Sequence, residues 1–114
     1  MNEENMIESA AVAAGYRIHG WIGGRLFVVK GPNPADDFDP FHWQPIEDDG
    51  DAFHLMVSLR LECIFDALGG SIEVHHSDYL ESAEYDVATK FDGSSKSVRR
   101  AIVMAAARLG GYHG

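Results

Sequence analysis

The prolines of this 114-residue chain are confined to one segment, and this restricts where regular structure can form. Each proline removes a backbone hydrogen-bond donor and interrupts both helices and central strands. The four of them are Pro32, Pro34, Pro40 and Pro45. We therefore predict a long irregular loop from Gly31 to Gly50, with regular elements on either side. Loops of this length in compact chains are usually functional or packed by their own side chains.

The segment before this loop has the clearest local pattern. Two β-type runs, Tyr16–Ile22 and Arg25–Lys30, are separated by Gly23-Gly24. Because glycine takes positive φ at little cost, both central positions of a tight turn are available, and the pattern predicts a β-hairpin. Upstream, the alanine-rich stretch Glu4–Ala14 starts with acidic residues and is followed by a glycine, which favours a helix.

After the loop the pattern indicates a helix followed by three strands. The helix is expected to begin near Asp51, with Asp48 or Asp49 as its cap, and to end at about Leu59. Its end is ambiguous, because apolar residues continue at helical spacing as far as Leu68 while they also alternate as in a strand. The strands that we favour are Leu61–Phe65, Ser71–His76 and a further one formed by residues around Tyr85, Val87 and Thr89.

The last segment predicts a C-terminal helix. Serines at positions 94, 95 and 97 can cap it, and it is expected to run to Leu109 and to end at Gly110-Gly111. The fold class is therefore α+β in a single domain, residues 1–114. We expect one antiparallel sheet of about five strands flanked by helices, in the order N-terminal helix, β-hairpin, helix, three further strands and C-terminal helix.

Composition places the chain among compact intracellular domains. Hydrophobic residues make up 46% of it, too many for a disordered acidic tail. The longest apolar run, Ala101–Ala107, is far shorter than the roughly 20 residues that span a bilayer. The acidic start lacks the basic region of an export signal. The single cysteine, Cys63, cannot form an intramolecular disulfide. We expect a cytoplasmic protein.

Charge is unevenly distributed along the chain. The formal net charge is −9, yet residues 90–114 carry five basic residues against one acidic residue. A net negative charge disfavours direct binding to nucleic acid, whose affinity comes from neutralising phosphates. The basic residues Arg99 and Arg100 are expected either to solvate a helix face or to pair with an acid at position 47, 48 or 49.

Motifs for chemistry are weak. The six histidines show no metal-ligand spacing, and His75-His76 would point to opposite faces of a strand. The acidic run of residues 47–51 lacks the EF-hand pattern and suits a helix cap better. Cys63 lies in an apolar stretch where a thiol is normally inert. We therefore predict no catalytic residue, no metal site and no cofactor.

Two segments together resemble a known group of proteins. They are FDPFHWQPIEDDGDAFHLMVSLRL (Phe38–Leu61) and SVRRAIVMAAARLGG (Ser97–Gly111). Small phage- and prophage-encoded proteins of unknown function with the phage ABA-sandwich domain are similar in these segments. The resemblance implies a helix–sheet–helix sandwich and a bacterial host cell. It implies no activity, because none is established for the group.

The leading functional hypothesis is a non-enzymatic phage or prophage accessory protein that acts through protein–protein contacts, with a host or phage protein or with itself as a homodimer. One alternative is a metal-dependent enzyme acting on nucleotides or nucleic acid through the aspartates and His54. Another is an acidic DNA mimic that inhibits a host protein. The predicted contact residues are Phe38, Phe41, Trp43, Asp48, Asp49, Asp51, Arg99 and Arg100.

Overall fold

The computed structural model describes residues 3–30, 39–66, 68–76 and 86–112. In these ranges the chain forms three helices and six strands, so the α+β class and the predicted order of elements are confirmed. In chain order the elements are α1 (Glu3–Ala13), β1 (Tyr16–Ile22), β2 (Arg25–Lys30), β3 (Phe41–His42), α2 (Asp49–Ser58), β4 (Leu61–Asp66), β5 (Ser71–His76), β6 (Val87–Lys90) and α3 (Ser95–Leu109).

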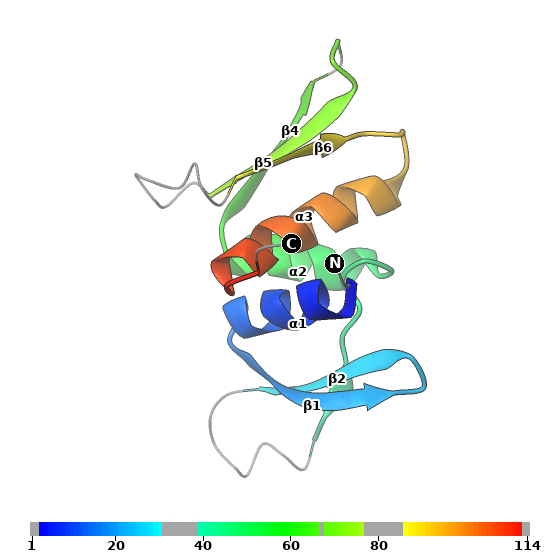
Figure 1. Cartoon of the computed structure of the whole chain (residues 1–114), viewed down its shortest axis with the longest axis vertical. Coiled ribbons are helices and arrows are strands. Elements are labelled where there is room, and N and C mark those ends of the chain that lie inside the picture. Colours follow the sequence, from blue (N-terminus) through cyan, green and yellow to red (C-terminus); the bar gives the residue numbers. More distant parts are fainter. Residues whose placement is uncertain (1–2, 31–38, 67, 77–85, 113–114) are drawn as a thin grey trace.

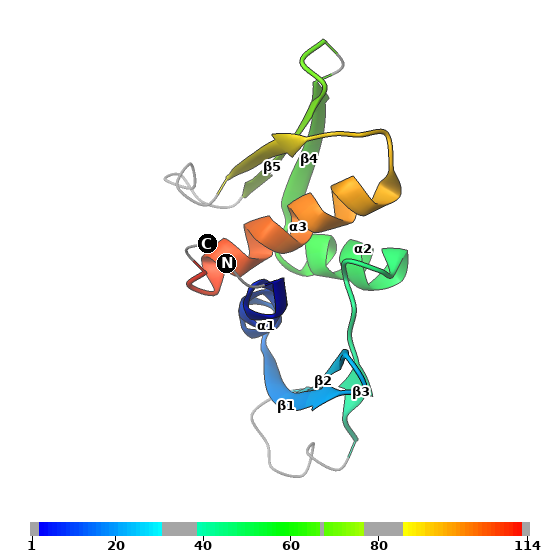
Figure 2. The same cartoon turned by 45° about the vertical axis from the view of Figure 1, so that its right-hand side comes forward.

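The strands form two antiparallel sheets instead of one. The first has the order β1-β2-β3 and the second the order β4-β5-β6. The three helices lie between the two sheets (Figures 1 and 2). α1 contacts β1, α3 contacts β5 and β6, and the two helices pack on each other. The molecule is therefore elongated across its layers, with extents of 48 × 32 × 25 Å.

The first sheet is built on the predicted hairpin, whose bounds are confirmed. Gly23 and Gly24 both have positive φ, 61° and 79°, as a tight turn between twisted strands requires. The prediction of a loop at Phe41-His42 is wrong, because these two residues form a short strand that pairs with β2. Two residues are too few to give a strand pattern in the sequence. Proline-rich positions 31–38 lie outside the described residues, so the predicted loop is tested only in part.

The second half of the chain follows the predicted boundaries closely. Asp48 is the cap of α2, since its Oδ1 accepts a hydrogen bond of 2.8 Å from the backbone N–H of Asp51. The helix ends at Ser58, and β4 begins at Leu61, which resolves the ambiguity in favour of a strand. The last of the three strands is β6, while Tyr85 lies outside the described residues.

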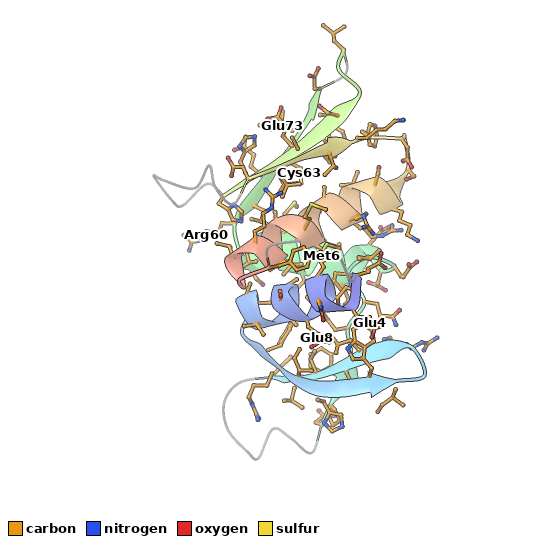
Figure 3. The ribbon with its side chains drawn as sticks, in the orientation of Figure 1. Glu4, Met6, Glu8, Arg60, Cys63 and Glu73 are labelled. Carbon is orange, nitrogen blue, oxygen red and sulfur yellow. The ribbon has the colours of Figure 1, made fainter. Side chains whose placement is uncertain are left out.

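The core is centred on α3, which is buried on several sides. Residues 101–103 and 105–107 are all buried, because α1 covers one side of the helix and the second sheet covers another. Met6 points from α1 into this layer (Figure 3) and is 1% exposed. A continuous apolar run in a helix is typical of burial all round. The second sheet, α1 and α2 together cover α3, and the first sheet covers α1 through β1.

No helix within the described residues is long and apolar enough to cross a membrane.

Candidate functional site

The predicted aspartates are engaged in local structure at the start of α2. Asp48 caps the helix, and Asp51 Oδ2 accepts a 2.9 Å hydrogen bond from the backbone N–H of Gln44. Asp49 is paired with the Arg99 guanidinium at 2.5 Å. Within the described ranges, no group of three metal-ligating side chains converges on one point. The aspartates therefore serve as caps and ion-pair partners and do not form a joint ligand set.

The basic residues of α3 tie this helix to the acidic part of the chain. Arg99 Nε also donates a 2.6 Å hydrogen bond to the carbonyl of Ile46, so this one side chain holds both the loop and the helix start. Arg100 pairs with Glu3 of α1. The remaining contacts are Lys96 with Glu47 at 3.3 Å and Arg108 with the carbonyl of Asp86 at 2.5 Å. The predicted pairing of Arg99 or Arg100 with an acid before α2 is confirmed for Arg99.

We expect Arg99→Gln to destabilise the fold by about 1–2 kcal/mol, because it removes a donor to a buried carbonyl and one ion pair. Arg100→Gln should cost less than about 0.5 kcal/mol, since its partner Glu3 is exposed. Thermal melts of both variants beside the parent chain measure the difference. Equal melting temperatures for the two variants would show that Arg99 has no special structural role.

The aromatic residues of the proline-rich segment do not form an exposed contact surface where they are described. Trp43 is 2% exposed and its ring meets Tyr16 edge-on, with centroids 5.6 Å apart. Phe41 is half-buried and packs on the same tyrosine. The prediction of Trp43 as a contact residue is therefore wrong, because the ring anchors the loop in the core. Phe38 lies outside the described residues.

A histidine–aspartate cluster lies at the end of β5. His75 Nδ1 is 2.8 Å from Asp86 Oδ2, and its Nε2 is 3.2 Å from Glu73 Oε1. The neighbouring His76 is buried on the inner face, as strand geometry requires, and its backbone N–H donates to Asp86. The hydrogen bond to Asp86 raises the pKa of His75 against the opposing effect of burial. For Asp86, burial raises the pKa, but the hydrogen bonds from His75 and His76 outweigh it and lower the pKa.

This cluster should give the stability a specific pH dependence. The contribution of His75 is present below its unfolded pKa of about 6.5 and is lost as the pH rises through its higher folded pKa. The contribution of Asp86 is present above about pH 4 and is lost as the pH falls through its lower folded pKa. Asp86→Asn should therefore lower the melting temperature most near pH 5 and less near pH 8.

An NMR titration is the direct measurement, since Asp86→Asn should also return the pKa of His75 towards its usual value. Glu73→Gln serves as the matched variant, because its contact with His75 is longer and contributes less to the pKa. A melting-temperature difference for Asp86→Asn that does not change with pH would contradict the assignment.

Exposed apolar side chains gather on another part of the molecule. Among the described residues seven large apolar side chains are exposed, and five of these lie on α2, on β4 and in the turn between β4 and β5. They are Phe53, Val57, Ile64, Phe65 and Leu68, which we call the β4 surface. The turn presents its leucine fully, since the backbone N–H groups of Leu68 and Gly69 are bonded back to Asp66. Phe65 lies on the inner face of β4, whereas Ile64 lies on the opposite face. Exposed apolar residues that gather in one place mark interaction sites.

A groove runs beside β4, between this strand, α2 and the start of α3. Its volume is about 640 Å³, and its walls are mostly apolar. Phe53 and Met56 come from α2, while Cys63 and Phe65 come from the inner face of β4. Asp49 and Arg99, which are predicted contact residues, also line it. The remaining lining residues are Gly50, Ala52, Ser95, Val98 and Ile102.

The edge of β4 is the least protected strand edge of the described structure. β4 pairs with β5 along six residues in regular register, and no described strand lies on its other side. The other edges are shorter or irregular: β1 carries a register shift at Ile18/Gly20, β3 has two residues, and β6 has four and ends in Lys90. Natural proteins use short strands, bulges and lysines to prevent edge pairing. β4 is neither short nor bulged and has no lysine, and its charged residues are Glu62 and Asp66.

Cys63 lies on the side of β4 that faces the helices, whereas Glu73 lies on the opposite side of the sheet (Figure 3). Its Sγ is 3.5 Å from Met56 Sδ, and burial raises the pKa of the thiol. A raised pKa lowers the thiolate fraction, and the thiolate is the reactive form. The thiol therefore acts as a small apolar group in the floor of the groove.

A second pocket, of about 570 Å³, lies between α1, the β1–β2 turn and the segment after β3. Trp21, Trp43 and Ile46 are among its lining residues, and three glutamates stand at its rim. Two of these, Glu3 and Glu47, are paired with Arg100 and Lys96. Its charge is thus largely balanced within the chain.

In the part of the chain that the structure describes, the fold is α+β, and the six-residue edge of β4 lies beside an apolar groove. Comparison with protein-family models, with curated proteins and with solved structures found no match.

Proposed function

We propose that the chain is a non-enzymatic protein that acts through protein–protein contacts, and that the β4 surface is its contact site. The observation that carries this proposal is the coincidence of an open strand edge, a groove of about 640 Å³ and five exposed apolar side chains. Of the five, Phe53 and Phe65 lie together, because both line the groove. Exposed apolar side chains that gather in one place are costly in water and are usually covered by a partner.

The mode of contact that fits this surface is strand addition. A partner segment in extended conformation would pair its backbone with the open edge of β4, and alternate side chains would enter the groove. Phe53 and Phe65 would flank those side chains, since both line the groove and are exposed by 62% and 54%. Backbone pairing supplies affinity in such complexes, and the groove supplies specificity.

The cellular setting is proposed on the resemblance of the segments at residues 38–61 and 97–111 to phage and prophage proteins. We propose that the chain acts in the cytoplasm of a bacterial host, as an accessory protein of a phage or prophage. The paired aspartates support the non-enzymatic part of the proposal, because Asp48, Asp49 and Asp51 already have structural partners.

Selection of peptides from a random displayed library against the immobilised chain tests this proposal. We expect enriched peptides with alternating apolar residues, and we expect Phe53→Glu to weaken their binding at least about tenfold. Val12→Glu is the matched control, because Val12 is also a helical residue, is 55% exposed and lies on α1. Failure to enrich any peptide, or equal loss of binding in both variants, would contradict the proposal.

A further inference from the structure

We infer that the pocket between α1, the β1–β2 turn and the segment after β3 is a binding site for a small, uncharged molecule with a planar aromatic ring system. Its volume of about 570 Å³ falls within the roughly 300–1,000 Å³ that small-molecule sites usually have. The inference goes beyond the proposed function, because within the described part of the chain this pocket and the groove beside β4 share no lining residue.

The pocket is lined by both tryptophans of the chain, Trp21 and Trp43. Trp43 lies in its floor beside Leu26 and Ile46, and because none of the three is more than 2% exposed, the pocket reaches down to the core. Trp21 is half-buried in its wall. Glu8 extends from α1 towards the first sheet (Figure 3), and its Oε2 accepts a 2.8 Å hydrogen bond from Trp21 Nε1, which fixes the orientation of this indole. Flat aromatic groups pack favourably on such rings.

A β-bulge in β1 turns Trp21 towards this pocket. The register shifts by one residue between Ile18 and Gly20, so β1 has an extra residue there. Because side chains alternate between the two faces, a regular register would put Trp21 opposite Arg25, on the face that points away from α1. The extra residue instead places Trp21 opposite the buried Leu26, on the face where it bonds to α1. Bulges that re-aim a side chain are common beside functional sites.

The pocket opens at the β1–β2 turn. Gly23 and Gly24 line it there without side chains, and a Cβ added at either would meet no heavy atom of the described residues within 4 Å, apart from its chain neighbours. A ligand can therefore enter beside this turn. The half-buried Gln44 also lines the pocket, and its side-chain amide can donate a hydrogen bond to a polar substituent of the ligand or accept one from it.

The charges at the rim favour an uncharged ligand. Three glutamates and Arg25 line the rim, and two of the glutamates are paired with cations of α3, Glu3 with Arg100 and Glu47 with Lys96. Three cations therefore stand against three carboxylates, and neither an anion nor a cation gains a net attraction. A charged ligand would also lose hydration against the apolar floor, and an uncharged one would not bear this cost.

NMR of the indole N–H groups of the isotope-labelled chain is the direct test. The spectrum should contain two such signals, and both belong to residues that line this pocket, so binding in the groove beside β4 would not shift them directly. The probes are naphthalenemethanol, naphthylmethylamine and naphthoate, which share one ring system and differ in charge. We expect the alcohol to shift both signals with a Kd below about 1 mM, and the amine and the carboxylate to bind at least about fivefold more weakly.

Two substitutions of Trp21 isolate the contribution of its ring. Trp21→Phe and Trp21→Leu both remove the hydrogen bond to Glu8, but only the first keeps an aromatic face. We expect Trp21→Leu to bind the alcohol at least about fivefold more weakly than Trp21→Phe does. The remaining Trp43 signal shows whether each variant is folded. Ile22→Ala is the matched control, because Ile22 is the next residue of β1, is 56% exposed and should leave binding unchanged.

Three results would overturn the inference. The first is that neither indole signal shifts with the alcohol at about 5 mM, a concentration at which a millimolar Kd would be visible. The second is that the amine or the carboxylate binds as tightly as the alcohol, which would assign a charged ligand. The third is equal binding by folded Trp21→Phe and Trp21→Leu. None of these results affects the peptide selection, which tests the proposed function at the β4 surface.

Discussion

Gly110→Ala is expected to lower the free energy of unfolding by about 3 kcal/mol and the melting temperature by more than about 10 °C. Gly110 follows α3 and has an ordinary φ of −83°, so alanine suits the backbone there. Its added Cβ, however, would lie 2.0 Å from the carbonyl oxygen of Ser9 and 2.8 Å from its carbonyl carbon. Both atoms belong to the backbone of α1, so relief requires the two helices to move apart.

The helix pair that would have to move is packed through small residues. Ala10 and Ala11 of α1 and Ala105–Ala107 of α3 are fully buried in the same core cluster. Close-packed interiors transmit such a displacement, because few voids are available to absorb it. The cost should therefore appear in the global unfolding transition, measured by urea denaturation followed by circular dichroism.

Gly69→Ala is the matched control for this substitution. Gly69 lies in the turn between β4 and β5, and its added Cβ would meet only the carboxylate of Asp66, a flexible side chain. We expect a loss of less than about 1 kcal/mol there. A comparable loss in both variants would show that the α1–α3 contact is looser than the distance to Ser9 implies.

The local elements could be predicted from the sequence because each has its own short-range cause. Gly23-Gly24 permits the turn of the first hairpin, and Asp48 and Ser94 supply side-chain oxygens for the caps of α2 and α3. These signals act within a few residues and need no tertiary contact. The bounds of β1, β2 and β5 therefore agree with the prediction.

The division of the strands into two sheets could not be predicted from short-range sequence signals. Strand pairing between distant segments is decided by which faces are covered, and the two-residue strand β3 exists only because it lies beside β2. The continuous apolar run Ala101–Ala107 indicates only that α3 is covered on several sides. The cover comes from α1, α2 and the second sheet, so the run gives no sign of the first sheet.

The candidate site was predictable only in its charged part. An acidic cluster at residues 47–51 and a basic cluster at Arg99 and Arg100 predict an ion pair between them, and Asp49–Arg99 is that pair. Whether β4 is an edge strand depends on the rest of the chain leaving one of its sides uncovered. The pattern of residues 61–66 alone does not predict this. The adjacent apolar residues Ile64 and Phe65 are the relevant signal, because they place large side chains on both faces of one strand.

Trp43→Ala is expected to lower the free energy of unfolding by about 4 kcal/mol, within the range for removing a buried tryptophan ring. Trp43 is 2% exposed, and its backbone N–H donates a 2.9 Å hydrogen bond to Leu26 that alanine would retain. The loss therefore measures the packing of the ring against Tyr16 and the rest of the core. Urea denaturation at 25 °C gives the value, with the slope shared between parent and variant.

Phe53→Ala provides the contrast that separates the two aromatic residues. Phe53 is 62% exposed on α2, and alanine is the better helix former, so stability should change by less than about 0.5 kcal/mol. Binding of selected peptides should nevertheless weaken, since the ring lines the groove beside β4. If Trp43→Ala is well tolerated and Phe53→Ala unfolds the chain, the assignment of core and contact surface is reversed. The opposite pattern means that one aromatic residue holds the fold together while the other remains exposed for a partner.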